Sequence, residues 1–200
     1  AGIRQAASSS VTAFTGSISN DTIYALSNTD PLSGVVVTGI LMTGSTASGT
    51  SLTVSKNYIY SFSNLSTNSF AELRGINLTG GINTLHNNMV SLGTDAEGTP
   101  LTNNLTICGI YETGGSNRFS FNSIYIGGTG VTGTNKSYAL RSLTTGVTRI
   151  YSNNIFHNAR SGTGKHYAIQ LSGTGVNPGG LTSVNNLFFA NGTGGILGLY

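Results

Sequence analysis

The chain has 200 residues, of which Gly, Ser, Thr and Asn together make up 102, while only 8% are charged and the formal net charge is +3. Disordered chains usually combine high net charge with few aromatic residues, whereas this chain has 9 Tyr and 8 Phe, so its composition favours a folded protein. Apolar residues occur in short runs between turn-forming residues, and no stretch of ten or more has helical apolar spacing. We therefore expect an all-β fold.

A similar short segment recurs along the chain. Its five copies read SKNYIYSF, LHNNMVSL, SFNSIYIG, YSNNIFHN and SVNNLFFA, each with an Asn two residues before an aliphatic or Met residue. These asparagines are Asn57, Asn87, Asn122, Asn153 and Asn185, at intervals of 30, 35, 31 and 32 residues. A second column places a small residue before an aliphatic one: Ala25-Leu26, Gly75-Ile76, Gly109-Ile110, Ala139-Leu140, Ala168-Ile169 and Gly198-Leu199. Two interleaved columns with one period predict stacked coils, with an ordinary β-sandwich as the alternative.

Stacked coils explain why Asn interrupts the apolar segments. Asn is a poor strand residue, but it tolerates the left-handed backbone conformation needed at a bend. Equivalent residues of successive coils lie about 4.8 Å apart, so their side chains can hydrogen-bond along the axis. We therefore expect the five asparagines to form a structural ladder, with the aliphatic residue two positions later pointing inward.

The Asn ladder and the coil length resemble right-handed parallel β-helices of the pectin-lyase-like class. Segments such as TVSKNYIYSFSN and NNIFHNARSGTGKHYAI look like the β-helical repeats of very large secreted bacterial surface proteins of the kind exported by the type IX route. The resemblance implies a secreted, surface-displayed repetitive scaffold. The expected architecture is a right-handed parallel β-helix of about six coils in a single domain over 1–200, with less regular coils in 1–50 and regular repeats in 51–200.

One position after the expected core residues lies a largely aromatic column, which strand alternation would direct outward. It contains Tyr60, Val90, Tyr125, Phe156 and Phe188. An exposed aromatic stripe could hold sugars or a neighbouring fibre, and the alternative is a second core layer under loops. The candidate partner or glycan contacts are Tyr60, Tyr125, Phe156, Phe188, Arg160 and Lys165.

Charge is distributed unevenly. Residues 1–115 contain three basic and all six acidic residues, whereas 116–200 contain six basic residues and no acidic one. If the axis follows the sequence, one end is mildly acidic and the other basic, which suits either head-to-tail stacking or an acidic glycan. Six charges spread over 85 residues without a nucleic-acid-reading motif argue against nucleic acid, and no apolar run is long enough for membrane insertion.

Candidate catalytic groups are sparse. Asp95 and Glu97 form the one close acidic pair, which Glu72 and Glu112 could approach across coils, but solvated loop charges are the simpler interpretation. His157, Arg160, Lys165 and His166 could bind an anion or perform acid–base chemistry, although no nearby carboxylate orients either imidazole. His86 is expected to be structural. Cys108, the single cysteine, is expected to be a small buried residue, and no cofactor or metal is expected.

The function expected from these observations is a non-enzymatic structural or adhesive component of the bacterial cell surface or extracellular matrix. The C-terminal segment GGILGLY resembles an interior coil without a cap, so we expect self-association through end-to-end stacking, with a filament subunit as one form. The alternative is a carbohydrate-binding module, and a polysaccharide lyase or hydrolase is a less favoured third hypothesis.

Overall fold

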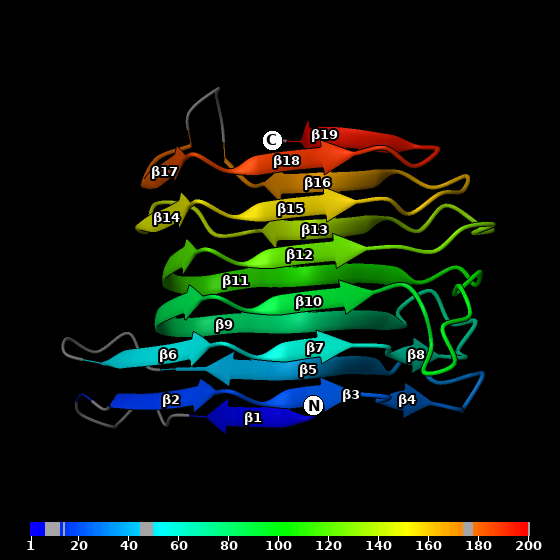
Figure 1. Cartoon of the computed structure of the whole chain (residues 1–200), viewed down its shortest axis with the longest axis horizontal. Helices are drawn as coiled ribbons and strands as arrows, with labels where there is room; N and C mark the ends of the chain where they lie inside the picture. Colours follow the sequence, from blue (N-terminus) through cyan, green and yellow to red (C-terminus); the bar gives the residue numbers. More distant parts are fainter. Residues whose placement is uncertain (7–12, 14, 45–49, 174–177, 200) are drawn as a thin grey trace.

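The computed structural model describes residues 1–6, 13, 15–44, 50–173 and 178–199, and it is an all-β parallel solenoid (Figure 1). The main sheet has eleven strands. Seven follow one another along it: β1 (Ile3–Ala6), β5 (Val36–Thr43), β9 (Glu72–His86), β11 (Thr106–Ser120), β13 (Ser137–Ser142), β16 (His166–Leu171) and β19 (Gly195–Leu199). Four pair beside this path: β2 (Thr15–Ser19), β6 (Ser51–Ser55), β14 (Arg149–Ser152) and β17 (Leu181–Val184).

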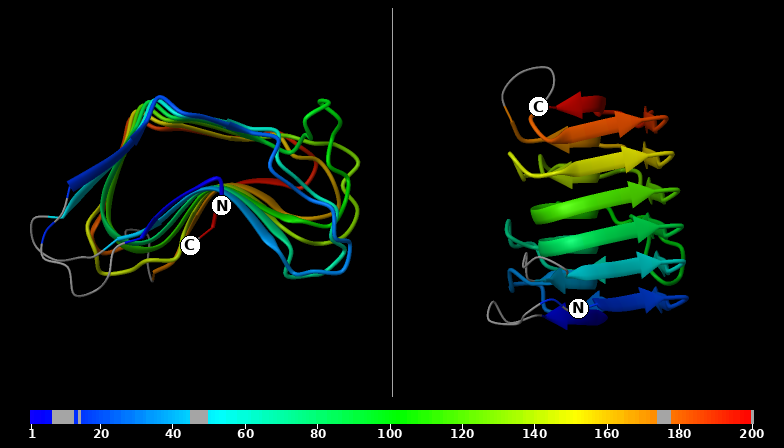
Figure 2. Two further views of the ribbon diagram at one scale, coloured as in Figure 1. Left: turned by 90° about the horizontal axis from the view of Figure 1, so that it is seen from below. Right: turned by 90° about the vertical axis from the view of Figure 1, so that its left-hand side faces the viewer.

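A second sheet, here called the outer sheet, has six strands. They are β3 (Thr22–Tyr24), β7 (Tyr58–Tyr60), β10 (Met89–Leu92), β12 (Ser123–Ile126), β15 (Ile155–Asn158) and β18 (Leu187–Ala190). The short β4 (Ser27–Asn28) and β8 (Ser63–Asn64) form a third, two-stranded sheet. Stacking follows the sequence from one end of the molecule to the other, and the coils superpose when viewed along the axis (Figure 2). Within the described residues there is no helix, and hence none long and apolar enough to cross a membrane.

The predicted parallel β-solenoid is confirmed, with about five turns instead of about six. Residues of 1–50 join the same sheets as the regular repeats, because β5 pairs with β9 and β3 pairs with β7. The second predicted column is partly wrong at its ends. Gly39-Ile40, not Ala25-Leu26, lies beside Gly75-Ile76, and Ile169 pairs with Gly198 and not with Leu199.

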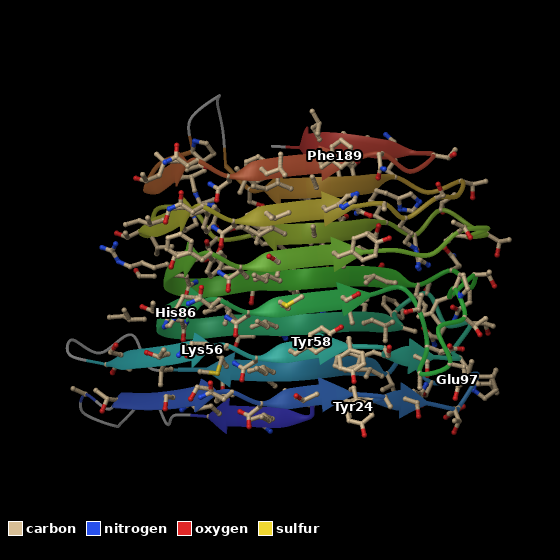
Figure 3. All side chains as sticks on the ribbon, in the orientation of Figure 1. Tyr24, Lys56, Tyr58, His86, Glu97 and Phe189 are labelled. Atoms are coloured by element: carbon tan, nitrogen blue, oxygen red, sulfur yellow. The ribbon has the colours of Figure 1, made fainter. Side chains whose placement is uncertain are left out.

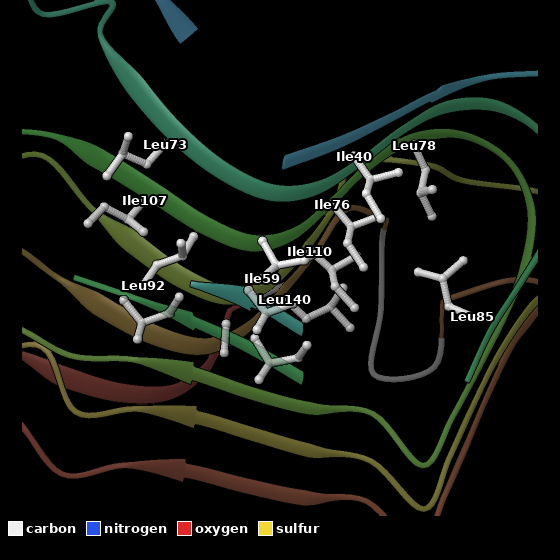
Figure 4. Packing of buried hydrophobic residues seen from close by; sticks show 14 of the residues in the cluster. Ile40, Ile59, Leu73, Ile76, Leu78, Leu85, Leu92, Ile107, Ile110 and Leu140 are labelled. Atoms are coloured by element: carbon white, nitrogen blue, oxygen red, sulfur yellow. The ribbon is translucent and has the colours of Figure 1, made fainter. Parts of the chain in front are cut away.

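The core is narrowest where the two sheets approach each other. Ile40, Ile76, Ile110 and Leu140 form a buried column on the main sheet (Figure 4). The preceding glycines permit the approach: a Cβ on Gly39 would lie 2.8 Å from Cγ2 of Ile59, and one on Gly75 would lie 2.5 Å from Cγ1 of Val90. Small residues in this column therefore let the inward side chains of the outer sheet reach the main sheet.

The asparagine ladder exists, but three of its five members were predicted one residue too early. The hydrogen-bonded column runs through Asn57, Asn88, Asn122, Asn154 and Asn186, with side-chain Nδ2 to Oδ1 distances of 3.0, 2.9, 2.9 and 2.8 Å. Asn87, Asn153 and Asn185 instead occupy the preceding position, with φ of 56°, 56° and 54°. Lys56 and Phe121 adopt the same left-handed conformation in the corners that have one Asn. The first Asn of each NN pair therefore forms the bend and the second forms the ladder.

This shift exchanges the inside and the outside at the same three corners. Met89, Ile155 and Leu187 were expected to point inward, but they are about half exposed. Val90, Phe156 and Phe188 take the inward position instead, in register with Ile59 and Ile124. The alternation of side chains in a strand makes this exchange unavoidable once the corner moves by one residue.

Replacing Asn122 with Ala should strongly destabilise the protein. Oδ1 of Asn122 accepts hydrogen bonds from N and Nδ2 of Asn88, and its Nδ2 donates to the carbonyl of Leu85 and to Asn154. The Ala variant leaves the Asn88 and Leu85 groups unpaired in the interior, so the free energy of unfolding should fall by roughly 2–6 kcal/mol in urea denaturation.

The matched control is Asn153→Gly. Asn153 is exposed and serves the bend, and glycine adopts its positive φ readily, so the change should stay within about 0.5 kcal/mol. Equal destabilisation by the two variants would show that the ladder has no special importance.

Candidate functional site

An aromatic and apolar strip covers the outward face of the outer sheet along the molecular axis. We call it the outer stripe; Tyr24, Tyr58 and Phe189 mark its extent in Figure 3. It comprises Tyr24, Tyr58, Tyr60, Met89, Tyr125, Ile155, His157, Leu187 and Phe189. Tyr24 is 58% exposed and Tyr125 42% exposed, so these rings offer a large apolar area to solvent.

Rings of the outer stripe contact one another within and across coils. Ring centroids lie 5.4 Å apart for Tyr24 and Tyr60, on neighbouring coils, and 4.3 Å apart for Tyr58 and Tyr60, on the same strand. Further along, His157 contacts Tyr125 at 5.1 Å and Phe189 at 4.9 Å. Such contacts hold aromatic side chains in fixed orientations, so a partner that binds here orders few of them.

The stripe is interrupted by a groove of about 230 Å³ in the middle coils. Ser91 and Ser123 stand where neighbouring coils carry larger side chains, because Ser91 is in register with Tyr60 and Tyr125 and Ser123 with Met89 and Ile155. Tyr58, Met89, Tyr125, Ile155 and His157 line the remaining sides. The groove thus combines aromatic walls with two hydroxyl groups.

The structure places some of the predicted partner contacts at the surface and others in the core. Tyr60 and Tyr125 belong to the outer stripe, as expected. Phe156 is fully buried, and the half-buried Phe188 stacks on it with centroids 5.5 Å apart, so these two rings belong to the core and not to an exposed face. The reason is the one-residue shift of the NN corners. His157 and Phe189, which were not predicted to belong to the aromatic column, take the outward positions instead.

Burial also changes the predicted basic surface. Lys165 is exposed, but Arg160 is completely buried and cannot contact a surface glycan. Arg149 is buried as well, so four of the six basic residues in 116–200 remain at the surface. The acidic and basic halves do lie at opposite ends of the axis, but their contrast at the surface is weaker than the sequence indicates.

The acidic residues are not gathered at one place. Glu112 lies inside the solenoid, where its carboxylate accepts hydrogen bonds of 2.5 Å from Nδ2 of Asn117 and from the hydroxyl of Tyr151. Glu72 pairs with Arg74 on the main sheet, at 2.5 Å. Oδ1 of Asp95 accepts hydrogen bonds from the backbone of Glu97 and Thr99 in the loop after β10. Among the described residues no three His, Cys, Asp or Glu side chains form a potential metal site.

Cys108 and the three histidines pack against or hydrogen-bond with other residues of the solenoid. Cys108 is fully buried, as expected, and burial raises the pKa of its thiol to about 12. His166 is fully buried beside Ser137. His157 contacts Oδ1 of Asn191 through Nε2, at 2.9 Å, and His86 contacts the side chain of Asn87.

A ladder of cations and rings on the main sheet was not predicted. The guanidinium of Arg74 lies 4.3 Å from the ring centre of Tyr111, and that of Arg141 lies 5.3 Å from Tyr111 and 4.7 Å from Tyr138. Arg74, Tyr111 and Arg141 lie on three successive coils, so the sequence shows their proximity only when the register between coils is known.

The chain was also compared with known proteins. No family model, no curated protein and no solved structure matches it.

Replacing Glu112 with Gln should change how stability depends on pH. Burial raises the pKa of Glu112 above its ordinary value of 4.5, so the folded protein keeps a proton there at pH values at which the unfolded chain has lost it. The free energy of unfolding of the wild type, relative to Glu112→Gln, should therefore fall as the pH rises from 4.5 towards 7. The slope should reach at most about 1.4 kcal/mol per pH unit in urea titrations.

The control is Glu97→Gln, which removes an exposed loop carboxylate and should follow the wild-type profile. Parallel profiles for the wild type and Glu112→Gln would contradict a raised pKa of the interior carboxyl group.

Proposed function

We propose that this protein is a non-enzymatic structural and adhesive component of the bacterial cell surface or extracellular matrix. The observation that carries the proposal is the outer stripe, which runs across all six strands of the outer sheet. A continuous apolar face on a rod suits an extended partner, because each further coil adds similar contacts along the same line.

The asparagine ladder in the interior is consistent with a structural role, because it makes the rod stiff. Each ladder amide from Asn88 to Asn154 joins its neighbours on both sides, so successive coils are connected by side chains as well as by strand pairing. Side-chain ladders and ring stacks along an axis are features of stiff stacked-strand assemblies. A surface location is supported by the resemblance of the repeats to those of secreted bacterial surface proteins.

End-to-end association is part of the proposal. β3 and β18 are the edge strands of the outer sheet, and β1 and β19 lie at the two ends of the main sheet path. Edge strands carry backbone groups that can pair with another strand. Further coils of the same chain or a second copy would continue the columns in the same way.

Replacing Phe188 with Lys should prevent such stacking. Phe188 is half-buried on the edge strand β18, and a Lys pointing inward at an edge opposes pairing with another coil. The wild type should form elongated particles longer than one chain as its concentration rises, measured by sedimentation velocity and electron microscopy, and Phe188→Lys should remain monomeric.

The control Leu187→Lys places the same charge on the outward face of β18, where the side chain is 55% exposed, and it should still stack. A strictly monomeric wild type at about 100 µM, where weak protein contacts are populated, would contradict end-to-end association.

The groove favours a second candidate function, a carbohydrate-binding module. Aromatic rings offer flat apolar faces, while Ser91 and Ser123 offer hydroxyl groups that donate and accept hydrogen bonds. This combination suits a sugar ring, which has an apolar face and polar edges.

If the groove binds a glycan, Tyr125→Ala should weaken binding about tenfold or more on a glycan array and in calorimetry, because the loss of one aromatic wall costs more than about 1.4 kcal/mol. Phe70→Ala is the control, since Phe70 is 77% exposed and lies outside the groove. Equal binding by both variants, or no bound glycan at all, would exclude this function for the groove.

A further inference from the structure

Arg160 is a charged side chain in the interior that pairs with no acidic residue in the part of the chain that the structure describes. It follows β15 and is completely buried. Its Nη2 donates one hydrogen bond, to the carbonyl of Asn103 at 3.3 Å, while Nε and Nη1 have no hydrogen-bond partner among the described residues. Within the described part of the chain the one ion pair joins Arg74 to Glu72, so no carboxylate pairs with Arg160. A buried guanidinium in this condition loses its hydration without compensation.

Arg149 shows how the same protein treats another buried arginine. Arg149 is also completely buried, but it contributes electrostatically to the environment of the buried Glu112. It donates hydrogen bonds to Oγ of Ser142 and to the carbonyl of Gly179, and among the described residues only its Nε lacks a partner. The two arginines therefore differ chiefly in the presence of an interior carboxylate.

A second unpaired polar atom lies in the surroundings of Arg160. His166 is fully buried, and its Nε2 has no hydrogen-bond partner among the described residues. Burial and then the charge of Arg160 lower the pKa of His166 to about 4, so the imidazole is neutral at pH 7. Asn158 connects the two residues, because its Oδ1 accepts from the backbone N of Arg160 and its Nδ2 donates to Ser137, whose Oγ contacts Nδ1 of His166.

The hydroxyl of Ser137 lies between Asn158 and His166. Nδ2 of Asn158 donates to Oγ of Ser137 at 2.9 Å, Oγ of Ser137 donates to Oδ1 of Asn158 at 3.2 Å, and the same Oγ lies 3.0 Å from Nδ1 of His166. These contacts fit a proton on either nitrogen of the neutral ring. The unused N–H donors that the structure defines here are Nε and Nη1 of Arg160.

Glycine backbone packs closely against both side chains. A Cβ on Gly128 would lie 3.1 Å from Nη1 of Arg160 and 2.9 Å from the carbonyl oxygen of Gly93, and one on Gly164 would lie 3.3 Å from Cε1 of His166. Gly128 has a φ of +96°, so its backbone also disfavours a side chain.

From the unpaired donors of Arg160 and the absence of a carboxylate paired with it among the described residues, we propose that the interior beside Arg160 binds a small monovalent inorganic anion, with chloride as the common occupant. Arg160 supplies the charge and both donors, Nε–H and Nη1–H. Because Arg160 also holds the carbonyl of Asn103, whose Nδ2 donates to the carbonyl of Asn64 at 2.6 Å, the anion stabilises loops from several coils together. This inference concerns the interior and is independent of the proposed surface function.

The test measures thermal unfolding of the whole chain in sodium chloride or sodium bromide, with sodium gluconate keeping the ionic strength constant. Gluconate is too large for a closed interior site. The melting temperature should rise by roughly 5–10 °C at a halide concentration about 100 times the dissociation constant. A melting temperature that does not depend on halide would overturn the proposal.

Two arginine variants make the test specific. Arg160→Met removes the charge while keeping a long apolar stem, and the halide-dependent rise should disappear. Arg149→Met should retain it, because that arginine belongs to the Glu112 cluster. A loss of the rise in both variants, or in neither, would contradict the assignment.

Crystals of the wild type grown in sodium bromide provide a readout that does not depend on any variant. Anomalous scattering should show one bromide within hydrogen-bond distance of Arg160. Water alone at this place, in crystals that contain bromide, would also overturn the proposal.

Discussion

The structure depends on hydrogen bonds between asparagine side chains of successive coils. In the middle of the ladder, Oδ1 of Asn122 accepts from two nitrogen atoms of Asn88, and its Nδ2 donates to Leu85 and Asn154. All four capacities of the amide are used inside a protein interior, where an unpaired polar group is costly. This requirement holds each corner above the previous one. The position of each corner in turn sets the register of the strand that follows it.

The sequence predicts the class of fold because the ladder leaves a period of about 32 residues, and periodicity survives small errors of alignment. It does not reveal which Asn of an NN pair is the ladder residue, since both suit a bend. The backbone conformations of Lys56 and Phe121 answer this question. Both residues have a positive φ at the bend, so the bend does not need Asn, whereas the buried ladder position after it needs a side-chain amide. One residue of uncertainty then decides that Phe156 is core and His157 is surface, because strand side chains alternate.

Charge could not be placed from the sequence for a different reason. The interior is apolar where the two sheets approach each other. Elsewhere it contains polar groups, such as Glu112 with Tyr151 and Arg160 near His166. A count of charged residues treats such groups as solvent-exposed. The surface position was therefore predicted correctly for Tyr60 and Tyr125, whose outward direction follows from a corner with one Asn, and wrongly for Arg160, whose burial depends on loops of other coils.

The outer stripe differs from the interior ring stacks in one informative respect. Inside, Phe156 stacks on Phe188 and Phe119 on Tyr151, and these rings serve packing between coils. Outside, the stack from Tyr24 to Phe189 is broken at Ser91 and Ser123 in the central coils. If contact between coils were the stripe's one role, larger residues at these positions would add favourable cross-strand pairs. Small hydroxyl side chains there instead leave a walled groove, which supports our proposal that the stripe binds a partner.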